Sequence, residues 1–379
     1  MMLLVAAALA ADLIVDVGEP ISLAVGGNWA RVLPEDEGWS FFWAAGGDYN
    51  RLPMGDDLTV VDRDRQVLTG HTDLVDHVLA RCPDGTLLHA ASANLESPND
   101  SAYAFRYDAA YALSAEVAVE ERRGDVAHND LPLACGGAGR DLVGFGAGSV
   151  VWLGPDLSLE TGTLADAPQM QGASFRWDGD ALVVYGVNYR GPLAVRRYDA
   201  DLTPVDAYDL DLAEPGAYIW WPQANLKVGQ YDVVAYMSRA DGESWVADSG
   251  NVWLVVLEDG AVVQKVQATA FAPGQGAMRP GLARRDDRVI LSYDVGIVPT
   301  LTEVTLDLAE VVVEDTGGDG EGADDAKGCG GCASGAGDGA WPLAWVIGLV
   351  GVWARRRDGV SRAGGVAAAD GGVAFHIRG

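Results

Sequence analysis

The sequence predicts an all-β protein, a six-bladed β-propeller of four-stranded blades over residues 12–314. Three observations support this prediction. Tight-turn residues recur six times, about 40 to 57 residues apart. An apolar run of four or five residues follows each turn, and alternating segments come after it. No long stretch keeps an apolar period of about 3.6, so helices are not expected in this region.

The recurring turns are rich in Gly and in acidic or amide residues, and Gly and Asp supply the positive φ and local hydrogen bonds that tight turns need. They lie at residues 35–38, 83–85, 136–139, 178–180, 229–230 and 286–287. The apolar runs follow at residues 39–43, 87–90, 142–145, 181–185, 233–236 and 289–293. Such runs suit strands that are covered on both faces. Residues 102–107 and 193–198 alternate instead, as strands with one exposed face do.

Six such units favour a propeller, because closing the ring protects sheet edges that would otherwise pair with other chains. A pair of β-sandwiches is the competing fold, since short strands separated by turns also describe sandwiches. The last unit needs an outer strand to complete it. We expect residues 13–23 to supply this strand, and the alternative is that residues 311–313 do so.

Composition limits the partners of the chain. With 379 residues, 49% of them hydrophobic, the chain is long enough to bury a full core. Its formal net charge of −29 argues against general affinity for nucleic acid or anionic lipid. No compact group of His and Cys ligands and no phosphate-binding Gly loop occurs, so neither a metal nor a cofactor is predicted. Cys82 and Cys135 either form a disulfide or remain buried thiols.

The two ends of the chain indicate export. Residues 3–10 are apolar, and the small residues at 8–10 are typical of a cleavage site, so residues 1–10 are predicted to be a signal peptide. A buried N-terminal strand is the alternative. Residues 315–328 are rich in Gly, Asp and Glu and are expected to form a disordered linker.

After this linker, Cys329-Gly330-Gly331-Cys332 is followed by an apolar run at residues 341–354 and by three arginines at 355–357. This order resembles the MYXO-CTERM sorting signal of exported bacterial surface proteins. The resemblance covers residues 329–357. It implies that sorting machinery processes or anchors the chain at Cys329 or Cys332. It also implies a membrane contact through a short hydrophobic helix, although about fourteen residues fall short of the roughly twenty that span a bilayer. Residues 358–379 extend past the arginines, and we expect them to be unstructured.

Candidate site residues come from segments just before the first strand of each unit, where the loops of a propeller meet the mouth of its channel. These segments are residues 28–31, 76–77, 128–130, 169–171, 220–223 and 278–280. From them we select six ligand-binding candidates, suited to hydrogen bonding and stacking: His77, His128, Asp130, Gln171, Trp221 and Arg279. The alternative is that these residues only cap strands and satisfy buried backbone groups.

The sequence thus predicts an exported propeller, displayed at the cell surface, that binds carbohydrate, peptide or an envelope protein without catalysis. A secreted polysaccharide hydrolase or lyase is the alternative function. In that case His128 and Asp130, two residues apart and so on one strand face, form the acid/base pair. A purely structural role in the envelope is a third possibility. No G-x-S-x-G nucleophile motif occurs in the sequence, which argues against a hydrolase of that type.

Overall fold

The computed structural model describes residues 12–309 and 311, except 47, 63–64, 69–73, 94–100, 122–130, 138–139, 146–147, 171, 189, 241–249 and 273–274. Two units are distinguished, Met1–Thr316 and Gly317–Gly379, and every described residue belongs to the first. The predicted signal peptide, linker, sorting segment and C-terminal tail lie outside the described residues. Strands and turns make up the described part, which contains no helix suited to crossing a membrane.

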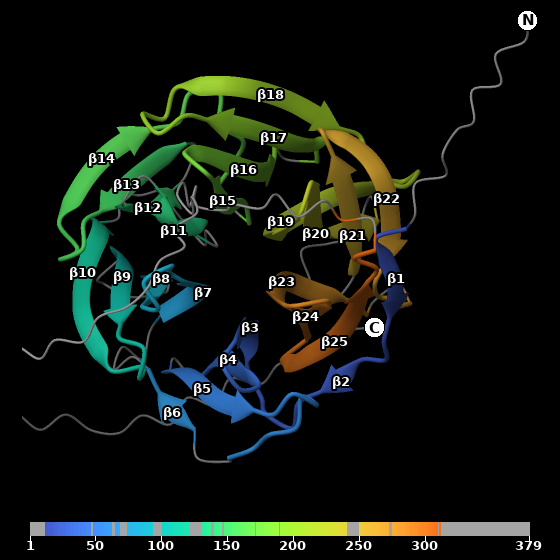
Figure 1. The fold of residues 1–379 in the computed structure, drawn as a ribbon, viewed down its shortest axis with the longest axis horizontal. Coiled ribbons are helices and arrows are strands. Elements are labelled where there is room, and N and C mark those ends of the chain that lie inside the picture. The colour runs from blue at the N-terminus through green and yellow to red at the C-terminus, as the bar shows by residue number, and fades with distance from the viewer. Residues whose placement is uncertain are drawn as a thin grey trace, which may run out of the picture. The chain divides into compact units, whose positions relative to one another are not determined.

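The strands form six antiparallel sheets, one for each predicted blade, arranged as a ring (Figure 1). Blade 1 has β3 (Asn28–Pro34), β4 (Trp39–Ala45), β5 (Asp48–Met54) and β6 (Gln66–Val67). Blade 2 has β7 (Leu74–Arg81), β8 (Leu87–Ala93), β9 (Ser101–Tyr107) and β10 (Leu113–Glu121). Blade 3 has β11 (Leu133–Gly137), β12 (Arg140–Phe145), β13 (Ser149–Leu153) and β14 (Leu159–Thr163).

Blade 4 has β15 (Ser174–Asp178), β16 (Ala181–Val187), β17 (Leu193–Tyr198) and β18 (Pro204–Leu210). Blade 5 has β19 (Ala217–Val228), β20 (Tyr231–Ala240), β21 (Gly250–Glu258) and β22 (Ala261–Gln267). Blade 6 has β23 (Ala277–Arg285), β24 (Arg288–Val295) and β25 (Val298–Leu306). All six predicted apolar runs lie in the second strands of their blades. The predicted six-bladed, all-β fold is therefore confirmed.

The N-terminal region completes the last blade. β1 (Ile14–Val17) pairs antiparallel with β25, and β2 (Ile21–Ser22) pairs with the same strand further along. The side-chain amide of Gln264 in blade 5 also bonds both backbone groups of Ile14, at 2.8 Å each. The prediction that residues 13–23 close the ring is confirmed.

Apolar packing between neighbouring blades forms the core. Six clusters of buried side chains fill the six interfaces, so that each blade packs against both neighbours. The second strands supply residues to the clusters on both sides. In β4, for example, Phe42 faces blade 2 whereas Phe41 faces blade 6. This two-sided burial explains why these strands have continuous rather than alternating apolar sequences.

Turns between the third and fourth strands repeat one local structure. In blades 1 to 4 an apolar residue with positive φ occupies the turn and is buried. These residues are Leu58, Tyr111, Leu157 and Leu202. An aspartate before it accepts hydrogen bonds from the following residues, as Asp57 does from the Thr59 backbone and hydroxyl. The hydroxyl and backbone bonds lower the pKa of Asp57 from its usual value. Part of the acidic composition therefore serves to build turns.

Candidate functional site

The innermost strands of the six blades surround the centre of the ring (Figure 1), and the space that they line is called the central channel here. The cavity within it measures about 390 Å³. All six innermost strands contribute residues to its wall: β3, β7, β11, β15, β19 and β23. Pro132 and Ala173, just before β11 and β15, line it as well. A cavity of a few hundred Å³ is large enough for a small molecule or the end of a chain.

The channel wall carries positive charge. Arg31, Arg81 and Arg284 line it, whereas no Asp or Glu does so among the described residues. The other polar lining residues are neutral: Ser174, Gln223 and Asn225. The contrast with a net charge of −29 for the whole chain is large. A cleft lined by one sign of charge focuses the electric field within it, so the channel differs electrostatically from the acidic surface.

Arg31 is the most buried of these arginines, with 7% of its surface exposed. Its Nη1 donates to the carbonyl oxygens of Ala30 (2.8 Å) and Arg279 (3.0 Å). Its Nη2 reaches Oε1 of Gln223 at 3.5 Å. No carboxylate of the described residues lies within ion-pair distance of this guanidinium. Gly281 makes room for it, because a Cβ there would lie 3.1 Å from Cδ of Arg31.

Four inner strands contain a bulge with a left-handed residue near their beginning. The residues are Trp29, Asp76, Trp221 and Arg279, with φ between 43° and 55°. In each strand the pairing with the second strand shifts at this point. A left-handed non-glycine residue costs on the order of 1–3 kcal/mol, and bulges redirect side chains. The segments expected just before the first strands therefore lie inside β3, β7, β19 and β23, which corrects the prediction.

Blade 4 reaches a similar backbone conformation with glycine. Gly172 lies two residues before β15 and has a φ of 66°. A Cβ at this position would lie 1.9 Å from the indole ring of Trp221. The close approach to blade 5 thus requires glycine, and Trp221 fills the space that it leaves.

The bulges bring two tryptophans and an arginine together, and none of these three residues is among those that line the cavity. The guanidinium of Arg279 lies 4.5 Å from the ring centre of Trp29 and 5.4 Å from that of Trp221. Its Nη1 also lies 3.5 Å from the carboxylate of Asp294. Cation–π contacts and this ion pair hold Arg279 between blades 1 and 5. Of the predicted ligand-binding residues, the structure brings Trp221 and Arg279 together.

Asp294 supports this cluster from β24. It is fully buried, and it accepts hydrogen bonds from the backbone nitrogens of Trp29 (2.8 Å) and Ala30 (3.2 Å). These donors become available where the bulge interrupts pairing between β3 and β4. Burial raises the pKa of Asp294, and the nearby Arg279 guanidinium opposes this shift. The carboxylate therefore holds the bulge of β3 and the Arg279 side chain together.

His77 does not face the channel. Its side chain is fully buried between blades 1 and 2, in parallel contact with the ring of Tyr49 at a centroid distance of 4.4 Å. Its Nε2 bonds the carbonyl of Leu74 at 3.2 Å, and its Nδ1 lies 2.9 Å from Nε2 of His89. Burial lowers the pKa of His77 to about 3. His77 is thus positioned as a neutral core residue, with no exposed atom to offer a ligand.

The remaining predicted site residues lie outside the described residues: His128, Asp130, Gln171, Cys329 and Cys332. The structure also places in the channel wall three residues that were not selected from the sequence. Arg31 and Gln223 belong to segments predicted to face the mouth but were not selected. Arg284 lies at the other end of its strand. The sequence signal that could have identified the two arginines is a basic residue within the first strand of a blade.

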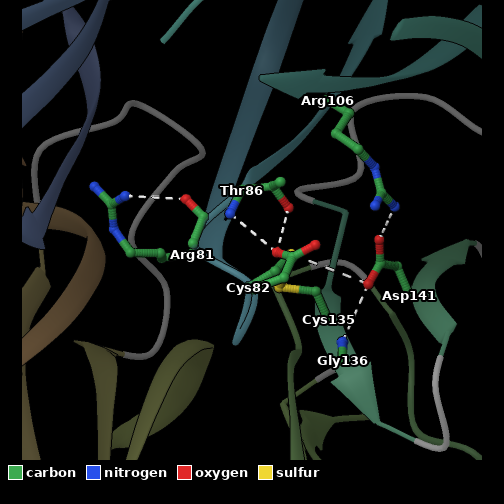
Figure 2. Close-up of a disulfide and its surroundings, with 9 residues drawn as sticks. Arg81, Cys82, Thr86, Arg106, Cys135, Gly136 and Asp141 are labelled. Atoms are coloured by element: carbon green, nitrogen blue, oxygen red, sulfur yellow. Dashed lines mark hydrogen bonds and ion pairs between the residues drawn. A yellow bond between two sulfur atoms is a disulfide. The ribbon is translucent and has the colours of Figure 1, made fainter. Parts of the chain in front are cut away.

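Cys82 and Cys135 form a disulfide between blades 2 and 3, with their Cα atoms 5.2 Å apart (Figure 2). Asp141 lies beside it, bonded to the backbone nitrogen of Gly136 (3.1 Å) and paired with Arg106. Burial raises the pKa of Asp141 against the effect of Arg106. In the described part of the chain, these two sulfurs and Asp141 are the one grouping of possible metal ligands. The disulfide occupies both sulfurs, so the group is not a thiolate metal site.

The described wall carries groups that can hold a ligand. Its ionisable groups are arginines, which stay protonated under ordinary conditions. Two polar atoms of lining residues, Nε2 of Gln223 and Oδ1 of Asn225, are buried and have no hydrogen-bond partner among the described residues. Because these atoms have almost no accessible surface, a ligand would bond them only after the side chains turn toward the cavity.

No protein-family model matches the chain, and no curated protein matches it. Solved structures similar to it include a glucose dehydrogenase, at 12% identity over 78% of this chain and 100% of that one, with a TM-score of 0.49. BamB from Moraxella catarrhalis is 10% identical over 76% of this chain and 99% of its own, with a TM-score of 0.41. The WD40 domain of Toxoplasma gondii coronin is 10% identical over 80% and 90%, with a TM-score of 0.41.

Proposed function

We propose that this chain is an exported propeller, displayed at the cell surface, that binds a ligand in its central channel without chemical conversion. Carbohydrate, peptide and an envelope protein are the ligand classes considered. One observation carries the proposal: the channel wall holds the buried Arg31 and unpartnered buried amide atoms of Gln223 and Asn225. Unsatisfied buried polar atoms cost on the order of 1–3 kcal/mol each, and a bound ligand would recover this cost when the two side chains turn toward it.

Export to the surface is supported by the sequence. The segment at residues 329–357 resembles a sorting signal, and residues 3–10 have the composition of a signal peptide. The Cys82–Cys135 disulfide is in keeping with an oxidising compartment. Protease treatment of intact cells tests the location, because a displayed chain is digested whereas a cytosolic chain survives. Survival of the full-length chain would contradict the proposal.

Binding is tested by incubating the full-length protein with a panel of polysaccharides and peptides, while measuring both retention and product release. We expect binding without product release. Gln223→Ala should weaken binding about tenfold, because it removes a donor worth about 1 kcal/mol or more. Gln230→Ala is the matched control, since Gln230 lies in a turn of the same blade and does not line the channel. Equal binding by both variants would place the ligand elsewhere.

The hydrolase or lyase alternative keeps one supporting observation. In the sequence, His128 and Asp130 lie four and two residues before Pro132, and Pro132 and Leu133 line the channel. In the same panel, this alternative predicts product release that His128→Ala abolishes. Such a result would replace the binding function with catalysis.

A further inference from the structure

We propose that the ligand of the central channel is a small organic oxyanion, such as an acidic sugar, and that Arg31 and Gln223 hold its carboxylate, phosphate or sulfate group. This inference rests on the proposed binding function and narrows it to one ligand chemistry. It starts from the lining, which contains three arginines and no carboxylate of the described residues.

The three arginines differ in how much of their charge is already used. Arg81 is paired with Glu35 at 3.0 Å, and Arg51 shares the same carboxylate at 3.8 Å, so part of the Arg81 charge is balanced within the protein. Arg284 donates from Nε to the carbonyl of Asp286 (2.7 Å), and no described carboxylate pairs with it. Arg31 bonds only neutral oxygens. Two of the three guanidinium groups therefore have no carboxylate of the described residues within ion-pair distance.

The burial of Arg31 makes this observation specific. Keeping an unpaired charge out of water costs several kcal/mol unless a partner of opposite charge is bound. The buried carboxylate of Asp294 is already engaged by two backbone nitrogens and Arg279. Arg31 acts on Asp294 only from beyond ion-pair distance, where it partly offsets the burial that raises the pKa of that carboxyl. An anionic ligand in the cavity would be the first group of opposite charge in direct contact with Arg31.

The geometry provides a second donor at the same place. Nη2 of Arg31 makes a single long contact, 3.5 Å to Oε1 of Gln223. The other atom of that amide, Nε2, is buried and has no partner among the described residues. When this side chain turns toward the cavity, Nε2 and the Arg31 guanidinium supply two neighbouring N–H donors, one of them charged, which match the two oxygens of a carboxylate or phosphate.

The opposite part of the wall defines the rest of the ligand. Blades 2, 3 and 4 line the cavity mainly with apolar side chains: Val78, Leu79, Leu133 and Phe175. A cavity of about 390 Å³ lined by arginines and by many apolar side chains fits a compact molecule that has an anionic group and a ring or short aliphatic body.

Calorimetry on the full-length protein tests this inference with three probes: galacturonate, galactose and inorganic phosphate. Galacturonate and galactose differ only at the carbon that carries the carboxylate. We expect galacturonate to bind at least about tenfold more tightly than galactose, phosphate to bind and compete with it, and added salt to weaken both anions. Arg31→Gln should reduce galacturonate affinity about tenfold or more, and Arg284→Gln should reduce it less.

Arg31→Lys and Arg140→Gln are the controls. The lysine variant keeps the charge and should retain more affinity than Arg31→Gln, provided that both melt cooperatively. Arg140 is half-exposed, pairs with Glu160 on blade 3 and is absent from the channel wall, so its loss should leave affinity unchanged. Equal affinity for galactose and galacturonate, or no binding of either anion, would overturn the inference. If neutral polysaccharides still bind and Gln223→Ala weakens them, the proposed function stands without an anionic ligand.

Discussion

The interface between blades 1 and 2 and the interface between blades 2 and 3 join the same kind of sheet in different ways. The first contains large aromatic side chains and two buried histidines. These residues are Trp29, Phe42, Tyr49, His77, His89, Phe105, Tyr107 and Tyr111. The second is filled by Ala, Val and Leu side chains and carries the disulfide. Small side chains bury less area per residue, and a covalent link offsets this. The blades of this propeller thus share one backbone arrangement, although different side chains fill the interfaces between them.

The largest expected effect comes from removing the covalent link between blades 2 and 3. The cysteines are 53 residues apart, so the disulfide restricts a long loop in the unfolded chain. Replacing both by serine (Cys82→Ser with Cys135→Ser) should lower the free energy of unfolding by about 2–4 kcal/mol. Guanidinium denaturation measures the change. The matched control is Cys329→Ser with Cys332→Ser, which removes two cysteines outside the propeller. Equal stability of wild type and the Cys82/Cys135 variant would show that the apolar contacts alone hold this interface.

The next effect concerns the two buried histidines between blades 1 and 2. Burial lowers the pKa of His77 to about 3 and that of His89 well below its usual value. In the unfolded chain both protonate near pH 6.5. The unfolded state therefore takes up protons first, and stability falls as the pH drops from 6.5 toward 3. The slope should reach at most about 1.4 kcal/mol per pH unit for each histidine.

Unfolding experiments between pH 7 and pH 5 on wild type and His89→Gln measure this dependence. The glutamine keeps a donor for Nδ1 of His77 but does not titrate, so the variant should lose part of the pH dependence. This range lies above the ordinary pKa of Asp and Glu, whose protonation adds its own effect at lower pH. An identical pH dependence in both proteins would contradict the role of the pair.

Much of the fold was predictable because the signals are local. Turn residues and apolar second strands recur in each blade, and the leftover apolar segment at residues 13–23 matched the missing outer strand. The position of His77 was not predictable, since its burial depends on Tyr49 and His89 from other strands. No local pattern tells a residue at a channel mouth from one that faces the next blade.

The candidate site was predicted in part for the same reason. Trp221 and Arg279 were selected from separate blades, and the structure brings them together through Trp29 and Asp294. The left-handed position in each of these bulges is not a glycine, so the sequence gives no sign of the bulge. Periodicity alone therefore placed these segments before the strands instead of inside them. Asp294 directly follows the predicted apolar run at residues 289–293 and lies within the second strand, which was the available signal for a buried carboxylate.

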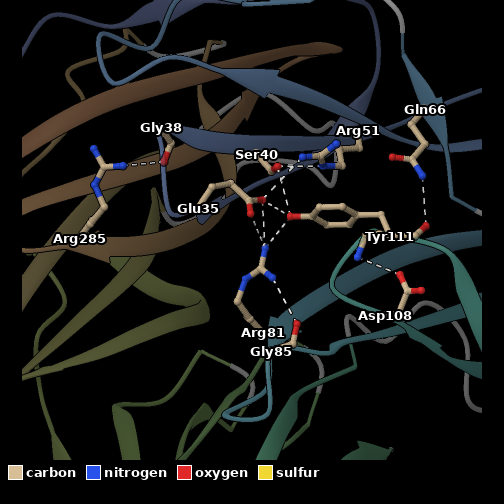
Figure 3. Close-up of polar contacts among 11 residues, drawn as sticks. Glu35, Gly38, Ser40, Arg51, Gln66, Arg81, Gly85, Asp108, Tyr111 and Arg285 are labelled. Carbon is tan, nitrogen blue, oxygen red and sulfur yellow. Dashed lines mark hydrogen bonds and ion pairs between the residues drawn. The ribbon is translucent and has the colours of Figure 1, made fainter.

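The smallest predicted effect involves Tyr111, which distinguishes the polar interface from its neighbours. In blades 1, 3 and 4 a leucine takes the same turn position, whereas the Tyr111 hydroxyl crosses to blade 1 and bonds Glu35 and Ser40 (Figure 3). Arg81 pairs with the same glutamate, and the guanidinium of Arg51 lies 3.8 Å from the centre of the tyrosine ring. Tyr111 therefore joins the two blades by hydrogen bonds and by a cation–π contact.

Tyr111→Phe should cost about 1 kcal/mol in the free energy of unfolding, because it removes the hydroxyl bonds but keeps the ring under Arg51. Tyr111→Leu, which copies the other blades, should cost roughly 0.5–1 kcal/mol more through loss of the cation–π contact. A double-mutant cycle with Glu35→Gln separates the hydroxyl bond from the ring contact, and we expect a coupling of about 0.5–1.5 kcal/mol. If all three variants unfold like wild type, the aromatic packing alone holds blades 1 and 2 together. The two interfaces would then differ in side-chain size and covalent linkage, not in polar bonding.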